Sequence, residues 1–290
     1  MTTMQMEVII LAVLFSLSCS LVGVFLVLKR MAMMSDAISH TVLLGIVLGY
    51  LVTKDLTSPL LFIGAVVMGL LTVYFVEVIK NTKLLSEESS IGVVFPLLFS
   101  IAVIIISKFL GNTHIDTDMV LLGELVFAPL NRVEILGLSV PESLLPSLII
   151  LLINTLVIAL FYKELTISSF DIVLATTLGF SPILLNYLLM TLVSITAVTT
   201  FNAVGVIVMI AFMVGPPITA QLLTNRLLPL IAVSCLFAIW NVISGYLLAR
   251  HFDISIAGSM ALMTGISYLL VFAFNTQKNV WQQKVIVSKQ

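Results

Sequence analysis

Residues 33–49 read MMSDAISHTVLLGIVLG and place two ionisable side chains, Asp36 and His40, inside a stretch that is otherwise apolar. On an α-helix a spacing of four residues puts both side chains on one face, about 6 Å apart along the axis. Gly45 and Gly49 follow as a pair of small residues at the same spacing, which favours close approach of a neighbouring helix. Because an ionisable pair within a bilayer is costly, this stretch predicts a functional site.

The composition is that of an integral membrane protein. Of the 290 residues 60% are hydrophobic and 9% are charged, and the mean hydropathy is +1.23. Runs long enough to cross a hydrocarbon core of about 30 Å leave no room for a large soluble domain. They fall near residues 7–28, 37–53, 58–79, 91–110, 144–162, 182–200, 203–223, 228–249 and 254–274. We therefore expect an all-α polytopic protein of about eight to nine transmembrane helices, since the second run is short and the sixth and seventh are barely separated.

The domain organisation and orientation follow from the same runs. We expect one transmembrane domain over residues 1–275 and a short basic tail over 276–290. Lys and Arg in short connections mark the cytoplasmic side of a membrane protein. With the N-terminus outside, nine of the 13 basic residues lie inside and four outside. The sequence thus predicts an N-terminus outside and a C-terminus in the cytoplasm.

Carboxylate oxygen and imidazole nitrogen form a ligand set that suits Mn²⁺, Fe²⁺ or Zn²⁺ better than Cu(I). Two ligands do not hold a divalent ion, but a two-fold homodimer with its pore on the axis would bring both copies of Asp36 and His40 together. Water-tolerant octahedral coordination favours Mn²⁺, whereas a four-coordinate site favours Zn²⁺.

Three other interpretations of the pair stay open at the level of the sequence. Asp36 would serve equally well as the N-cap of the second span. The two side chains would also form an ordinary contact between residues i and i+4. His40 would otherwise hydrogen-bond a neighbouring helix and stabilise packing.

Several classes of activity are not supported by the sequence. No G-x-x-x-x-G-K-[ST] motif occurs among the fifteen glycines, and neither HExxH nor a serine or cysteine catalytic constellation is present. The chain is therefore not expected to be an enzyme, and no nucleic-acid partner is expected. A secondary cation transporter driven by an ion gradient is the alternative function. It would need further intramembrane carboxylates, which are sparse, with Glu77 near the end of its run.

The longest polar segment, residues 111–142, is predicted to lie outside. Its apolar part, 119–130, is too short to span and is expected to form a re-entrant or surface helix. Three acids, Asp116, Asp118 and Glu124, would attract cations to an outer vestibule by their local field. Acids in an exposed loop are also commonly just solvated.

The segment Lys163–Ser181 is predicted to lie inside. Ser169 is the expected N-cap of a helix that runs to Leu178, and Gly179 is its expected stop. About ten residues cannot cross a bilayer, so this helix is predicted to lie at the cytoplasmic interface between two spans.

Residues 21–49, LVGVFLVLKRMAMMSDAISHTVLLGIVLG, resemble the signature of the permease subunits of bacterial manganese, zinc and iron ABC importers. The family motif D-A-x-S-H-x-V-x-x-G is matched by Asp36, Ala37, Ser39, His40, Val42 and Gly45. The likeness extends in order over roughly residues 5–275. It includes GVIVMIAFMVGPPITAQLL at 205–223, where the second proline replaces a more usual alanine and predicts a local helix break.

The resemblance implies a permease similar to those of type II ABC importers, in a bacterial plasma membrane. It implies import of Mn²⁺, or alternatively Zn²⁺ or Fe²⁺, past Asp36 and His40 in a homodimer, with no permanently bound cofactor. A separate cytosolic ABC ATPase and an extracytoplasmic metal-binding protein would be its partners. The residues of the family's coupling helix, which docks into the ATPase and spans about 168–180 here, would be Phe170, Asp171, Ala175 and Gly179.

Overall fold

The structure is a computed structural model, and it describes residues 3–55, 58–109, 132–135 and 138–287 together with residues 125 and 128. Each of the nine apolar runs forms a helix. The helices are α1 (Thr3–Leu28), α2 (Ala32–Thr53), α3 (Pro59–Asn81), α4 (Glu87–Phe109), α6 (Leu144–Leu160), α7 (Tyr162–Phe170), α8 (Ile172–Thr177), α9 (Pro182–Val204), α10 (Val206–Gln221), α11 (Leu227–Phe252) and α12 (Ile256–Val287). The predicted all-α fold is confirmed, with one small addition.

That addition is an antiparallel hairpin of β1 (Arg132–Ile135) and β2 (Leu138–Pro141), in which Arg132 pairs with Pro141. It lies in the polar segment predicted to be outside, where no strand was expected. The Arg132 guanidinium binds both carboxylate oxygens of Glu7 on α1, at 2.8 and 2.7 Å. The vestibule acids Asp116, Asp118 and Glu124 lie outside the described residues, so their role stays a prediction.

Seven helices of the described chain are long and apolar enough to cross a membrane, namely α1, α2, α3, α4, α9, α11 and α12. The pair α6 and α7, bent by 72°, raises the number to eight if it counts as one span. The apolar helix α10 has 16 residues and falls short of the length required. The count therefore meets the lower end of the predicted eight to nine.

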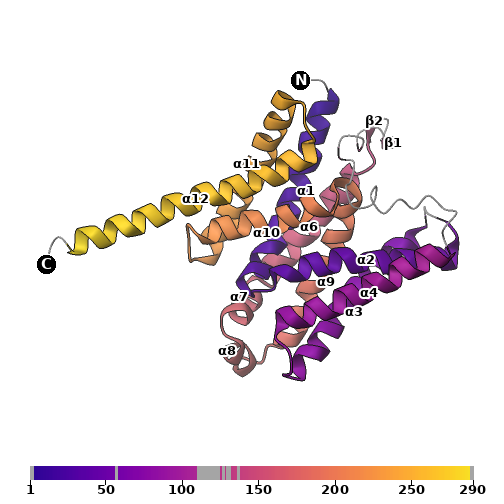
Figure 1. The fold of residues 1–290 in the computed structure, drawn as a ribbon, viewed down its shortest axis with the longest axis horizontal. Helices are drawn as coiled ribbons and strands as arrows, with labels where there is room; N and C mark the ends of the chain where they lie inside the picture. The colour runs from indigo at the N-terminus through magenta and orange to yellow at the C-terminus, as the bar shows by residue number, and fades with distance from the viewer. Residues whose placement is uncertain are drawn as a thin grey trace.

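The helices form two groups (Figure 1). One contains α2, α3 and α4, and the other contains α1, α10, α11 and α12, with α9 packing against members of both. Large side chains that are fully buried include Phe15 and Phe25 on α1 and Phe212 on α10. The C-terminal part of α12 extends beyond the other helices.

The predicted close approach at Gly45 is confirmed. A Cβ atom added to Gly45 would lie 2.2 Å from the carbonyl oxygen of Gly64 on α3, and one added to Gly64 would lie 2.6 Å from the oxygen of Gly45. Further along the same interface, the hydroxyl of Thr72 donates to that of Thr41 at 2.7 Å. Backbone contact thus fixes α3 against the helix that carries the candidate site.

The predicted break at the double proline is wrong, because α10 runs through both Pro216 and Pro217. The missing N–H groups deprive the carbonyls of Phe212 and Met213 of their helical partners. Packing compensates, because a Cβ on Gly23 of α1 would lie only 1.8 Å from the Met213 oxygen. The α1 backbone therefore lies directly on the freed carbonyl, and neighbouring helices commonly allow such prolines inside membrane helices.

Candidate functional site

The start of α2 sets the position of the candidate ligands. Helix α1 ends at Leu28, Arg30 adopts a left-handed conformation with φ of 61°, and the Met31 N–H donates to the Leu26 carbonyl at 2.8 Å. Helix α2 then begins at Ala32, with Met31 as an N-cap that makes no side-chain capping bond.

Asp36 therefore lies inside α2, and its interpretation as an N-cap is wrong. Measured along the helix at about 1.5 Å per residue, Asp36 lies about 6 Å and His40 about 12 Å beyond the first residue.

Asp36 and His40 contact each other, as their spacing predicts. The Nε2 atom of His40 lies 3.4 Å from the Oδ1 atom of Asp36. That separation is long for a hydrogen bond. In the single chain the side chain of His40 remains 28% exposed and that of Asp36 34% exposed. The face that carries them is thus only partly covered by the chain's own side chains.

The imidazole of His40 also packs against two rings of α4. The His40 and Phe95 centroids are 5.6 Å apart at an interplanar angle of 28°, and the Phe99 ring meets the imidazole edge-on at 5.6 Å and 72°. The interpretation of His40 as a packing residue is thus partly right, but His40 packs on the neighbouring helix through aromatic contacts, whereas a hydrogen bond was expected. Sequence reasoning missed both phenylalanines, although their spacing of four residues on α4 places them on one face.

The residues that the structure describes supply only part of a coordination shell. Within the described residues no group of three or more His, Cys, Asp or Glu side chains is arranged to hold a metal ion. A divalent ion normally takes four or more ligands. The pair on α2 therefore needs further ligands, from beyond the described residues or from water, to bind such an ion.

The segment predicted as a coupling helix forms two short helices. The Asp171 carboxylate accepts a hydrogen bond from the Leu174 N–H at 2.9 Å and caps α8. The prediction of Ser169 as N-cap is wrong, because its hydroxyl donates to the Leu165 carbonyl inside α7 at 2.7 Å. Asp171 interrupts the helix, because its extended backbone ends α7 and starts α8.

The predicted stop at Gly179 is confirmed. Its φ is +86°, the left-handed region that glycine adopts without steric cost. The Phe180 N–H donates to the Ala175 carbonyl and the Gly179 N–H to that of Thr176, both at 3.0 Å, which is the hydrogen-bond pattern of a Schellman motif.

The surface around α8 is strongly apolar. Ala175 is fully buried, but the large apolar side chains of the segment are exposed, at 60% for Phe170 and 74% for Val173. Ile172, Leu174 and Leu178 are exposed as well. A contiguous exposed apolar surface on a short helix is typical of a protein contact.

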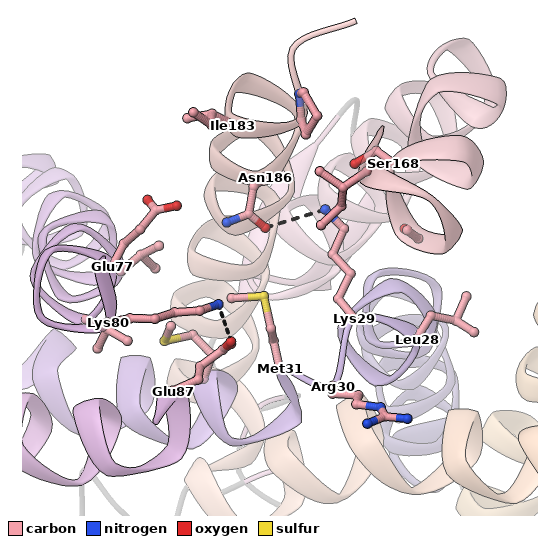
Figure 2. Close-up of a pocket in the computed structure, with 16 residues that line it drawn as sticks. Leu28, Lys29, Arg30, Met31, Glu77, Lys80, Glu87, Ser168, Ile183 and Asn186 are labelled. Atoms are coloured by element: carbon pink, nitrogen blue, oxygen red, sulfur yellow. Dashed lines mark hydrogen bonds and ion pairs between the residues drawn. The ribbon is translucent and has the colours of Figure 1, made fainter. Parts of the chain in front are cut away.

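A cavity of about 340 Å³ lies where this segment meets the ends of the spans (Figure 2). It is enclosed by the turn between α1 and α2, the end of α3, the start of α4, the α7–α8 segment and the start of α9. Met34, two residues before Asp36, is part of its wall. The cavity thus borders both the start of α2, which carries the candidate ligand pair, and the α7–α8 segment.

The model of the ABC 3 transport family matches residues 1–275. The chain belongs to the ABC 3 transport family. This membership confirms the resemblance found at residues 21–49 and identifies the chain as a multi-pass protein of a transport family.

Two curated relatives are similar over nearly the whole chain. The zinc transport system membrane protein TroD of Treponema pallidum is 47% identical over 284 residues, which are 98% of this chain and 77% of that protein. The manganese transport system membrane protein MntD of Bacillus subtilis is 40% identical, over 96% of this chain and 94% of that protein.

Solved structures have the same fold. A chain of PsaBC from Streptococcus pneumoniae, solved in complex with Fab, matches with a TM-score of 0.77 and 28% identity, over 93% of this chain and 91% of that one. A putative metal-chelate type ABC transporter in an inward-facing conformation matches with a TM-score of 0.64 and 16% identity, over 94% of this chain and 85% of that one, which supports the fold alone.

Proposed function

We propose that this chain is the membrane-spanning permease of an ATP-driven importer for a divalent transition metal, Mn²⁺ or Zn²⁺, in a bacterial plasma membrane. The observation that carries the proposal is the Asp36–His40 pair on a spanning helix, with a contact of 3.4 Å and both side chains partly open. Membership of a transport family agrees with this function.

The permease acts as a homodimer. Two ligands from each copy give four, enough for a tetrahedral Zn²⁺ site or, with water, an octahedral Mn²⁺ site. A two-fold axis along the pore brings the same face of α2 from both copies together. The 28% and 34% exposure of His40 and Asp36 supports this arrangement, because it leaves part of that face open to a second copy.

The choice of metal rests on ligand chemistry and on the relatives. Carboxylate oxygen is a ligand that Mn²⁺ favours, so the sequence slightly favours Mn²⁺ as the transported ion, and Fe²⁺ takes the same ligands. The relatives' names divide between zinc for TroD and manganese for MntD. We propose Mn²⁺ as the imported ion, with Zn²⁺ or Fe²⁺ as the alternatives, to be ranked by competition of each metal against uptake of the others.

ATP is hydrolysed on a separate subunit, because this sequence carries no P-loop. Phe170, Asp171, Ala175 and Gly179 form or flank α8, whose exposed apolar surface is suited to docking a cytosolic ABC ATPase. A metal-binding protein on the opposite side of the membrane delivers the ion.

The metal site is tested by Asp36→Asn and His40→Ala, each measured for Mn²⁺ and Zn²⁺ uptake in cells lacking the native gene. Each variant is expected to lower uptake at least tenfold, because losing one ligand from each copy removes two of the four ligands of the site. Asp253→Asn and His251→Ala on exposed positions of α11 and its C-cap are the matched controls. Uptake near the wild-type rate in both site variants, with normal membrane insertion, would remove the assignment.

The gradient-driven alternative is separated by the energy source. Uptake by wild-type cells is compared after ATP depletion and after collapse of the proton gradient. An ATP-driven importer stops in the first condition. Uptake that persists without ATP while the gradient holds would favour a secondary transporter.

A further inference from the structure

The cavity of about 340 Å³ beside the α7–α8 segment lies at the level of the membrane surface, since the spanning part of α1 ends at Leu28 and α3 ends at Asn81 beside it. Its size is at the lower end of the range of small-molecule sites in proteins. Its walls are chemically asymmetric, with hydrogen-bond donors on one side and carboxylates on the other.

The donor side centres on Lys29. Its ammonium donates to the Oδ1 atom of Asn186 at 3.5 Å (Figure 2), and no carboxylate among the described residues lies within ion-pair distance of it. Burial lowers the pKa of Lys29. That is the direction expected for an ammonium that is partly removed from water and lacks a compensating anion.

Ser168 supplies a second donor to the same wall. The residue is only 4% exposed, and its hydroxyl has no hydrogen-bond partner in the part of the chain that the structure describes. A buried hydroxyl without a partner is unfavourable, because it has lost its hydrogen bonds to water without replacing them. Lys29, Ser168 and the amide of Asn186 thus form a group of donors that lacks an anionic acceptor among the described residues.

The opposite wall carries the acids. Glu87 is paired with Lys80, whereas Glu77 has no basic partner in the described chain and accepts a hydrogen bond from the hydroxyl of Tyr187. Glu77 lies across the cavity from Lys29, with Asn186 between them in the view of Figure 2. The site therefore offers a cation and a hydroxyl to an anion on one side and a carboxylate to a cation on the other.

The rim is apolar. Ile172 on α8 and Ile183 on α9 line the cavity and are each 64% exposed. Leu184, the residue after Ile183 in the chain, is 70% exposed. A ligand whose polar end enters the cavity can lay a hydrocarbon part on these side chains.

We propose that this cavity binds a phosphoethanolamine group, with the phosphate on Lys29 and Ser168 and the primary ammonium on Glu77. The apolar rim points to a membrane phospholipid as its source, and soluble glycerophosphoethanolamine shares the same chemistry. A bound headgroup would connect the α1–α2 turn, which leads into Asp36, with the α7–α8 segment.

The test is native mass spectrometry of the full chain in detergent. It is titrated with phosphatidylethanolamine, with phosphatidylglycerol of the same acyl chains, and with glycerophosphoethanolamine. The wild type is expected to bind phosphatidylethanolamine about tenfold more tightly than phosphatidylglycerol, since one charge-assisted contact is worth about that factor. Stronger binding of the soluble compound than of the lipid would keep the site and assign it a cytosolic ligand.

Three variants assign the contacts. Lys29→Gln is expected to weaken binding of both lipids about tenfold. Ser168→Ala is expected to weaken binding of both lipids by a smaller factor, because it removes a hydroxyl and no charge. Glu77→Gln is expected to remove the preference for phosphatidylethanolamine while leaving phosphatidylglycerol bound. Lys163→Gln, a lysine of α7 outside the cavity, is the matched control and should bind as the wild type does.

Equal binding of the two lipids by the wild type would overturn the proposal. So would wild-type affinity in Lys29→Gln and Ser168→Ala proteins that keep the wild-type melting temperature. The uptake assay plays no part in these outcomes, so they are independent of the metal-import proposal.

Discussion

The imidazole of His40 is constrained from two directions. Its Nε2 atom faces the Asp36 carboxylate at 3.4 Å, and its ring lies against Phe95 and Phe99. A ligand that is held in one orientation binds a metal with less loss of conformational freedom than a mobile one. If His40 binds the transported metal as proposed, the phenylalanines are positioning residues, because their rings orient the imidazole without supplying a ligand atom.

Replacing these rings should change apparent affinity more than maximal rate. Each aromatic contact is worth about 0.5–1.5 kcal/mol, so Phe95→Leu and Phe99→Leu are each expected to raise the KM for metal uptake roughly two- to tenfold. The measurement is initial uptake of Mn²⁺ or Zn²⁺ against metal concentration. Phe109→Leu, at the exposed end of the same helix, is the control. An unchanged KM in both site variants would show that the ring contacts do not orient the ligand.

The two halves of this site differ in how far the sequence predicts them. Asp36 and His40 are four residues apart in one helix, so their contact depends only on helix geometry and was predicted correctly. Phe95 and Phe99 reach His40 only because α4 packs on α2. That packing depends on contacts between distant segments, which the local pattern does not contain.

The same distinction applies to whole elements. The nine apolar runs predicted nine helices, because hydrocarbon length and the need to satisfy backbone hydrogen bonds leave few alternatives. The prediction failed where local rules competed. Both Ser169 and Asp171 are residue types that cap helices well, and the structure uses Asp171. The double proline of α10 stays helical because Gly23 of α1 packs on the Met213 carbonyl that the prolines leave without a helical partner.

The α7–α8 segment yields a prediction about the ATPase contact. Val173→Asp replaces an apolar side chain that is 74% exposed with a charged one. Desolvating that charge in a protein interface is unfavourable, so the variant is expected to lose the ATPase on co-purification while its melting temperature stays close to that of the wild type. Leu84→Asp, at an 85% exposed position between α3 and α4, is the control. Retention of the ATPase by Val173→Asp would contradict the assignment of α8 as the docking element.

At the scale of the whole molecule, the connections sort into two sets. The turn after α1, the end of α3, the start of α4 and the α7–α8 segment meet at one cavity, and the sequence predicts all of them to lie inside. The ion pair between Glu7 and Arg132 joins two segments predicted to lie outside. The contacts of these segments thus agree with the relative sidedness that the positions of Lys and Arg predict.

Single cysteine substitutions measure the absolute orientation of the chain in the membrane. In a chain with Cys19→Ala and Cys235→Ala, Leu84→Cys and Ile254→Cys place exposed thiols in the α3–α4 and α11–α12 connections, at 85% and 49% exposure of the native side chains. If basic residues direct short connections to the cytoplasm and α10 crosses the membrane, as the nine apolar runs of the sequence predict, a maleimide that cannot cross the membrane will label the Ile254→Cys protein in intact cells. It will label the Leu84→Cys protein only after the cells are opened. The reverse pattern would place the N-terminus inside and the α7–α8 segment outside, where a cytosolic ATPase cannot reach it.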